Sequence, residues 1–167
     1  MIEDIFQYSF LLSLLTGMVR IATPLLLAAI GELVVERSGL MNLGVEGLIV
    51  IGAFGSFITA FFTGNLYLAI FVGGLVAAFY SLIFAFLTST LLADQTVSGL
   101  AINILASGLT FCLYRVIFTN FTGASLPNIK TFGSLPVPGL SKIPLIGPVL
   151  FNQTPLTYIS LIMVFVV

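Results

Sequence analysis

The chain has 167 residues, of which 59% are hydrophobic and only 7% are charged, with a formal net charge of −1. Soluble domains carry roughly 25% charged residues, so this composition excludes a soluble domain and leaves a membrane protein. The five scattered basic residues give no nucleic-acid footprint. With no histidine and a single cysteine, Cys112, the sequence also excludes an internal disulfide and a Cys/His metal site.

The first apolar segment follows an acidic start, whereas a signal peptide begins with basic residues, so we expect this segment to be retained. We predict a membrane span within about residues 10–36, whose apolar part carries one charge, Arg20. One placement runs from about residue 8 to 30 and buries Arg20 in the bundle. The other runs from about Arg20 to Glu36, with Arg20 at one interface. The second is favoured, because its roughly 17 residues reach ~25 Å, close to the ~30 Å hydrocarbon core.

Charged and flexible residues gather in the segment 32–48, between two long apolar runs. It holds half of the chain's six acidic residues and three glycines: Glu32, Glu36, Glu46, Gly39, Gly44 and Gly47. Carboxylates and amides at the edge of hydrocarbon indicate a broken helix that lines protein or water, and a plain polar turn between two spans is the alternative. Glu32 and Glu36 stand four residues apart, so their shared helix face requires water or a cation.

The charge-free run from Gly47 to Ala93 is too long for one span, because a single helix would measure ~70 Å. We predict two spans, at about 45–62 and 66–92, joined by a hinge at 63–65. In the second span small residues recur at every fourth position, which favours close helix packing. These residues are Gly73, Ala77, Ser81, Ala85, Ser89 and Ala93.

A fourth span is predicted at about 97–118, after the helix break and cap that Asp94 offers. Residues 119–155 hold six of the seven prolines, which predicts a long Pro/Gly-rich loop outside the membrane, with enough apolar residues to pack as a cap. A fifth apolar segment, 156–167, is too short to cross. We therefore expect an all-α, polytopic transmembrane helical bundle, a single domain fragment that is truncated at its C-terminus.

Five stretches of the chain carry a family likeness. Residues 20–31 (RIATPLLLAAIG) are followed by 36–48 (ERSGLMNLGVEGL) and by GAF at 52–54. Further along, residues 95–106 read QTVSGLAINILA and residues 143–155 read IPLIGPVLFNQTP. Together these stretches resemble the permease subunit of bacterial ATP-binding-cassette (ABC) importers for nucleosides. That family is a branch of the simple-sugar and branched-chain amino-acid permease superfamily, and the likeness covers nearly the whole chain.

The resemblance implies a multi-pass protein of the bacterial cytoplasmic (inner) membrane whose long loop faces outward. A count of basic residues alone gives the opposite orientation, and we follow the resemblance. The basic residues on the loop side are Arg115, Lys130 and Lys142, against Arg37 on the other side. The implied partners are ATPase subunits, a second permease that is identical or paralogous, and an external substrate-binding protein. The chain lacks a Gly-x-x-x-x-Gly-Lys-Ser/Thr loop, so we expect ATP hydrolysis in a separate subunit, with no enzyme activity and no cofactor here.

Three polar residues are our candidates for the transport path: Asn42, Glu46 and Asn103. Their amides and carboxylate could bond ribose hydroxyls or base edges. An equally open reading is that each of them fixes the broken helix by capping or by interhelical hydrogen bonds. The charges expected on the cytoplasmic side are Glu32, Glu36 and Arg37.

The predicted function is the transmembrane subunit of an importer, forming the translocation path for nucleosides or a related small polar solute. An ion channel or half of a secondary transporter, working without an ATPase, is the alternative, because broken helices suit that function as well. An intramembrane enzyme is disfavoured, because the sequence offers neither a histidine nor a metal-ligand spacing for a catalytic centre.

Overall fold

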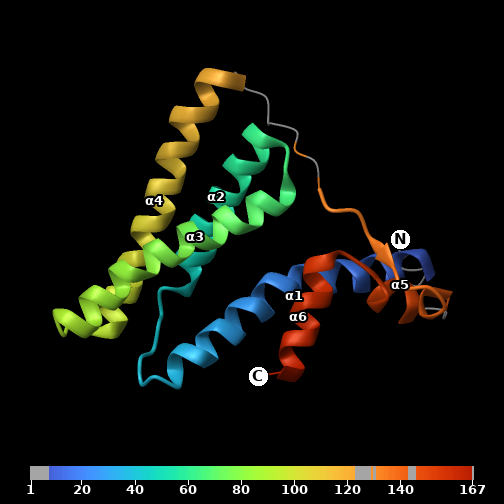
Figure 1. Cartoon of the computed structure of the whole chain (residues 1–167), viewed down its shortest axis with the longest axis horizontal. Coiled ribbons are helices and arrows are strands. Elements are labelled where there is room, and N and C mark those ends of the chain that lie inside the picture. The colour runs from blue at the N-terminus through green and yellow to red at the C-terminus, as the bar shows by residue number, and fades with distance from the viewer. Residues whose placement is uncertain (1–7, 123–128, 130, 143–145, 167) are drawn as a thin grey trace. The chain divides into compact units, whose positions relative to one another are not determined.

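The computed structural model describes residues 8–122, 129, 131–142 and 146–166 (Figure 1). In this described part, four helices are long and apolar enough to cross a membrane. This result confirms the predicted all-α polytopic fold. The chain divides into two compact units, Glu32–Thr131 and Met1–Gly31 with Phe132–Val167, and each is described by itself.

In the unit Glu32–Thr131, helices α2 (Val45–Thr63) and α3 (Leu66–Ala85) form a hairpin. The chain reverses at Gly64, whose φ of 66° lies in the left-handed region that glycine adopts without strain. The side chain of Asn65 then begins α3 by accepting two backbone N–H groups of its first turn, at 3.0 and 3.3 Å. This turn lies where the sequence predicts the hinge.

Helices α2 and α3 pack against each other through small residues. A Cβ atom on Gly73 would overlap the side chain of Ser56 and would lie 2.7 Å from the carbonyl oxygen of Gly52. A Cβ atom on Gly52 would in turn lie 3.2 Å from the Cβ of Ala77. The first two members of the predicted small-residue pattern therefore do bring two helices together.

The last two members of that pattern, Ser89 and Ala93, lie in or after a different kind of turn. Helix α3 passes into a π-helical turn, η2 (Phe86–Thr90), in which the N–H of Leu91 donates to a carbonyl five residues earlier at 3.1 Å. The wider turn adds a residue to the helical repeat, so the four-residue spacing loses its register before Ala93. Ser89 is accordingly exposed. The prediction of one packing face along the whole pattern was wrong for this reason.

Helix α4 (Gln95–Thr122) packs against α2 and starts behind Asp94, whose carboxylate accepts the N–H of Val97 at 2.9 Å. It is longer than the predicted 97–118, because its last turn continues into residues expected in the loop. A buried core joins α2, α3 and α4. Its members are Ile51, Tyr80, Phe84, Ile102 and Ala106.

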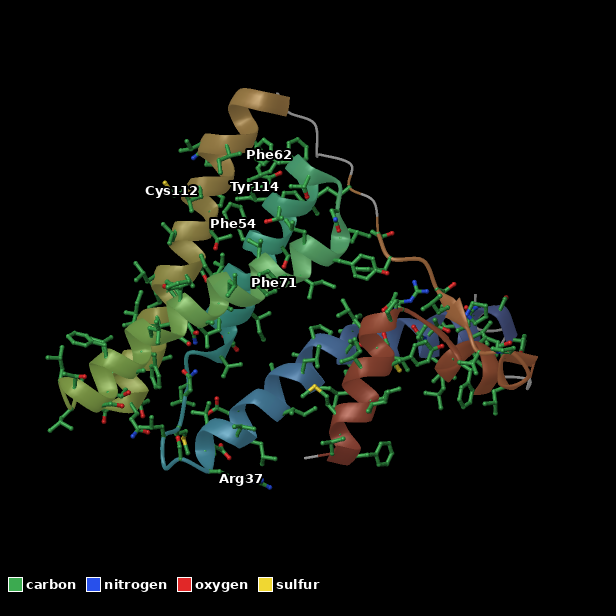
Figure 2. All side chains as sticks on the ribbon, in the orientation of Figure 1. Arg37, Phe54, Phe62, Phe71, Cys112 and Tyr114 are labelled. Atoms are coloured by element: carbon green, nitrogen blue, oxygen red, sulfur yellow. The ribbon has the colours of Figure 1, made fainter. Side chains whose placement is uncertain are left out.

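Most large apolar side chains of this unit lie outside that core (Figure 2). Phe71 on α3 is 66% exposed and Ile104 on α4 is 75% exposed. Exposure of so continuous an apolar surface to water is unfavourable, whereas lipid tails solvate it. The outward faces of these helices are therefore built to meet hydrocarbon.

In the other unit, helix α1 (Tyr8–Glu36) runs unbroken through Pro24, and its end from Glu32 onward belongs to the unit already described. Its 29 residues measure ~44 Å, longer than a ~30 Å hydrocarbon core. Both predicted placements of the first span fit within it. The residues before Arg20 extend the helix.

The long segment before α6 (Pro155–Val166) carries short elements in place of a long helix. They are the antiparallel strands β1 (Leu135–Pro136) and β2 (Asn152–Gln153), the 3₁₀ turn η3 (Leu140–Lys142) and α5 (Ile146–Leu150). The hydroxyl of Tyr158 on α6 accepts the N–H of Gln153 at 3.1 Å and donates to the carbonyl of Leu135 at 2.8 Å. Both strands are thus fastened to α6. The segment starts after Thr122, later than the predicted residue 119.

Candidate functional site

The polar connector between α1 and α2 is shorter than the predicted broken-helix segment 32–48. Helix α1 continues to Glu36 and α2 begins at Val45, so residues 37–44 alone leave the helical path. Gly39, with a φ of 85°, makes the first reversal, and its N–H donates to the carbonyl of Glu36 at 2.9 Å. The connector therefore begins as a helix C-cap built on glycine.

Two side chains from neighbouring helices hold the backbone of the connector. The Oε1 atom of Glu32, on α1, accepts the N–H of Asn42 at 2.6 Å. The Oε1 atom of Gln95, at the start of α4, accepts the N–H of Met41 at 2.8 Å. Asn42 is buried, and its own Oδ1 accepts the N–H of Gly44 at 2.9 Å, which closes the last turn before α2.

Asn103 adds a third brace from α4, one that reaches the start of α2 itself. Its Oδ1 accepts the N–H of Gly47 at 2.7 Å, and its Nδ2 donates to the carbonyl of Leu43 at 2.9 Å. The first N–H groups of a helix have no partner within that helix. Asn103 therefore caps α2 from a different helix, more than 50 residues away in the sequence.

Glycines let this polar junction form at close range. A Cβ on Gly99 of α4 would lie 2.9 Å from the backbone nitrogen of Gly44, and one on Gly47 would lie 3.0 Å from the Cα of Asn103. The first separation is shorter than real Cβ contacts, and the second is at their lower limit. The glycines thus allow the start of α2 to touch α4 backbone to backbone, which places Asn103 within hydrogen-bonding distance.

The candidate residues separate into two groups. Asn42 and Asn103 lie at the junction together with Glu32. Their hydrogen bonds there are of the capping and interhelical kind that the sequence indicated as one of two roles. Glu46 is exposed and makes no hydrogen bond within the described residues, and Glu36 and Arg37 are also exposed. A contact with transported solute stays a prediction for Asn42, Glu46 and Asn103, and so does a cytoplasmic position for Glu32, Glu36 and Arg37.

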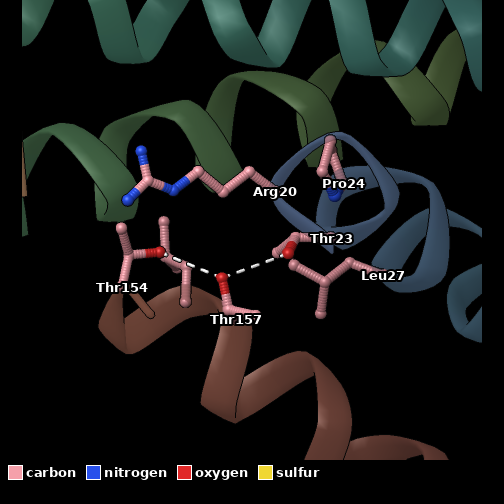
Figure 3. Close-up of a pocket in the computed structure, with 7 residues that line it drawn as sticks. Arg20, Thr23, Pro24, Leu27, Thr154 and Thr157 are labelled. Carbon is pink, nitrogen blue, oxygen red and sulfur yellow. Dashed lines mark hydrogen bonds between the residues drawn. The ribbon is translucent and has the colours of Figure 1, made fainter. Parts of the chain in front are cut away.

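A second polar site lies in the other unit, where sequence reasoning did not look for one. A pocket of about 290 Å³ opens between α1 and the start of α6 (Figure 3). From α1 it is lined by Arg20, Thr23, Pro24 and Leu27, and from the α6 side by Thr154, Leu156 and Thr157. The α1 residues have the spacing i, i+3, i+4, i+7, which places them on one helix face. That spacing around a charged residue is the signal that could have found the pocket.

Three hydroxyls form a chain along the floor of this pocket. The Oγ1 of Thr157 lies 3.1 Å from the Oγ1 of Thr23 and 3.1 Å from the Oγ1 of Thr154 (Figure 3). Thr23 and Thr157 are buried, whereas Arg20 at the rim is exposed. The Nε of Arg20 donates to the Oε1 of Gln153 at 3.5 Å, a long bond.

Gln153 is itself held in place by hydrogen bonds of its side chain and its backbone. It is fully buried, and its Nε2 donates to the carbonyl of Val149 at 2.7 Å. Its backbone N–H is bound to Tyr158, as described above. The pocket therefore sets one cation and several hydroxyls on a fixed frame, an arrangement that can donate and accept hydrogen bonds toward a small polar molecule.

Comparison with known proteins identifies the family. The family model of the branched-chain amino acid transport system permease component matches residues 14–167. NupQ of Bacillus subtilis, a guanosine ABC transporter permease protein, is 38% identical over 83% of this chain and 44% of its own length. NupC of Lactococcus lactis, a nucleoside ABC transporter permease protein, is 34% identical over 86% of this chain and 46% of its own length.

A third relative is TsgC13 of Haloferax volcanii, described provisionally as a glucose ABC transporter permease protein. It is 36% identical over 95% of this chain and 47% of its own length. No solved structure matches. The chain spans less than half the length of these three relatives. With its four membrane-length helices and the family match over 14–167, the chain is part of a multi-pass membrane protein and belongs to the family of the permease component of branched-chain amino acid transport systems.

Proposed function

We propose that this chain forms part of the transmembrane subunit of an ABC importer for nucleosides or a related sugar-bearing solute. The observation that carries the proposal is the family match over residues 14–167. Two of the relatives described above have names that specify a nucleoside or guanosine. The described helices support it, because their outward faces suit lipid while polar side chains gather at two junctions inside the units.

The same proposal includes partners and a location. ATP would be hydrolysed by separate ATPase subunits, a second permease, identical or paralogous, would complete the path, and an external binding protein would deliver the solute. The protein would lie in a bacterial cytoplasmic membrane, with the loop before α6 outside. The braced connector supports a mechanism in which the end of α1 from Glu32 onward, α2 and α4 move together when the path opens, since three side chains join them.

Uptake and co-purification of the full-length protein test this proposal. Cells that express it with its native neighbours should take up labelled guanosine, and depletion of ATP should stop that uptake. Collapse of the ion gradients at constant ATP should leave uptake largely intact. Purification in mild detergent should bring down an ATPase with a P-loop and a second permease.

The opposite pattern would overturn the proposal. Uptake that persists without ATP and stops when an ionophore collapses the gradients would favour a secondary transporter. A homo-oligomer that conducts ions and carries no ATPase, from a preparation in which other membrane complexes stay intact, would favour a channel.

A further inference from the structure

Arg20 is a charged residue of a membrane-length helix, and no counter-charge lies beside it in the described part of the chain. Every stretch of about 20 residues within α1, the length that crosses a membrane, contains Arg20, because the helix runs only from Tyr8 to Glu36. Within the described residues no carboxylate pairs with it, and its one hydrogen bond is the long one to Gln153. An ionisable side chain in a membrane helix marks a candidate functional site.

The guanidinium keeps unused donors at the rim of the pocket. Its Nε points to Gln153, whereas the two terminal nitrogens have no hydrogen-bond partner in the described part of the chain. A guanidinium presents its donors side by side in one plane. Two adjacent oxygen atoms of a ligand fit this geometry.

The rest of the pocket supplies acceptors and apolar walls. Pro24 has no N–H, so the carbonyl of Arg20, four residues earlier, receives no bond from it. The hydroxyls of Thr23, Thr154 and Thr157 add groups that accept as well as donate. The side chains of Leu27 and Leu156 complete the lining. A few polar groups among apolar walls, in a volume near 300 Å³, is the usual make-up of a small-molecule site.

The charges of the lining select among solute classes. The lining has one cation and no carboxylate. The carboxylate of a free amino acid could pair with Arg20, but its ammonium group would find no counter-charge there. An uncharged sugar ring instead offers adjacent hydroxyls to the guanidinium and an apolar ring face to the leucines.

We propose that the pocket bounded by Arg20, Thr23, Thr154 and Thr157 is a solute-binding site that recognises the adjacent hydroxyls of an uncharged sugar ring, such as the ribose of a nucleoside. The inference rests on the proposed import function. It adds the location of the binding site and the part of the solute that the site recognises, the sugar hydroxyls. Arg20 donates to two ring hydroxyls, and Thr157 orients the hydroxyl chain that binds the same edge of the ring.

The test compares two solutes in the full-length importer. Maximal uptake rates of guanosine and of 2′,3′-dideoxyguanosine are measured in proteoliposomes with one constant binding protein, so that changes in the rate ratio report on the permease alone. Arg20→Gln should lower the guanosine rate about tenfold or more, the size of a charge-assisted hydrogen bond, and should change the dideoxy rate much less. The ratio of the two rates should fall by a similar factor.

Further variants separate recognition from folding. Thr157→Val should lower the ratio severalfold, whereas Thr157→Ser, which keeps the hydroxyl, should retain it. Thr59→Val is the matched control, because Thr59 is a half-buried threonine of α2 whose hydroxyl donates to the carbonyl of Gly55 in its own helix. It should leave both rates unchanged.

The results that would overturn the inference are distinct from a failure of the import function. If the wild type imports guanosine and the rate ratio is unchanged in Arg20→Gln and Thr157→Val, the pocket is not the solute site, but the proposed import function still holds. Equal loss of both solutes in Arg20→Gln would make Arg20 a structural residue. If Arg20 instead binds lipid phosphate, Arg20→Lys should import as the wild type does, with the same ratio in every variant. Absence of ATP-dependent import by the wild type would overturn both proposals.

Discussion

Asn103 is the single residue on which the junction between α2 and α4 depends most directly. Asn103→Ala removes the acceptor for the N–H of Gly47 and the donor to the carbonyl of Leu43. The bond to Gly47 is partly buried, and the bond to Leu43 is exposed. We expect the variant to lose about 1–3 kcal/mol of stability, the net contribution of two intramolecular hydrogen bonds. Thermal unfolding of the full-length protein in detergent measures this loss.

Ser107→Ala is the control for that experiment, since Ser107 lies one turn further along α4 and is exposed. It should melt with the wild type. If both variants melted at the wild-type temperature, the cap that Asn103 makes would contribute nothing measurable to stability.

Glu32 provides a second prediction for a single residue. Its Oε1 binds the N–H of Asn42, but its Oε2 is buried and has no hydrogen-bond partner in the described part of the chain. A carboxylate with one buried oxygen unpaired costs more to bury than a neutral amide. Glu32→Gln, which keeps one oxygen acceptor, should therefore melt at or above the wild-type temperature, and Glu32→Ala below it.

Glu46→Gln is the matched control, because Glu46 is exposed and should tolerate the same change without effect. A Glu32→Gln protein that melts as low as Glu32→Ala would show that the negative charge itself holds the connector.

The sequence carried the identity of these polar residues but not their partners. Asn42 and Asn103 stand out as amides in or beside apolar runs, and capping was one of the two roles considered for each. The partner of Asn103 lies 56 residues away along the chain. Only the glycine contacts between α2 and α4 bring the two together, and a contact between distant residues leaves no local spacing that reveals it. The pocket beside Arg20 was missed in part for the same reason: the spacing of its α1 residues is local, but Thr157 lies 134 residues after Thr23.

At the scale of the helices, the contact between α2 and α3 depends on Gly73. Gly73→Ala places a methyl group against the Cβ and Oγ atoms of Ser56 and near the carbonyl of Gly52. The Cβ of Ser56 and the backbone of Gly52 cannot move far to make room. Overpacking of this kind typically costs about 1–3 kcal/mol. We expect the variant to melt at a lower temperature in detergent and to give less folded protein on size exclusion.

The neighbouring residue makes an internal control. A Cβ on Gly74 would meet no atom within 4 Å, so Gly74→Ala should be neutral or slightly stabilising, because alanine favours the helix. Equal melting of the two variants would mean that α2 and α3 do not pack at the distance seen here.

The hydropathy of the sequence predicted the positions of the helices correctly, but it did not predict where each helix ends. Long apolar runs fix where α2, α3 and α4 lie, because an apolar run of that length must satisfy its backbone internally. Their ends depend on local events that hydropathy does not record. One is the π-helical turn at Phe86–Thr90, and another is the continuation of α4 to Thr122. The short strand pair after α4 also escaped prediction, since a two-residue strand has no periodicity to detect.

At the scale of the whole molecule, two signals disagree about orientation in the membrane. Basic residues favour the cytoplasm, and Lys130 and Lys142 belong to the segment before α6 while Arg37 belongs to the connector. The resemblance to importers places that segment outside. A few charges give a weak preference, because the rule is a statistical bias over many loops, whereas the family match extends over residues 14–167. We therefore expect the connector to face the cytoplasm.

Cysteine labelling decides between the two orientations. Ser38 and Ser134 are both exposed, one in the connector and one in the segment before α6, so they make a matched pair. In a functional full-length protein whose other cysteines, including Cys112, have been replaced, Ser134→Cys should react with a membrane-impermeant maleimide in intact cells. Ser38→Cys should react only after the membrane is opened. The reverse pattern would establish that the basic residues set the orientation. The Arg20 pocket, which is lined by residues at the start of α6 just after that segment, would then lie nearer the cytoplasmic side. An outward-delivered solute would then reach the pocket only after crossing, so this one experiment also bears on whether the pocket is an entry site.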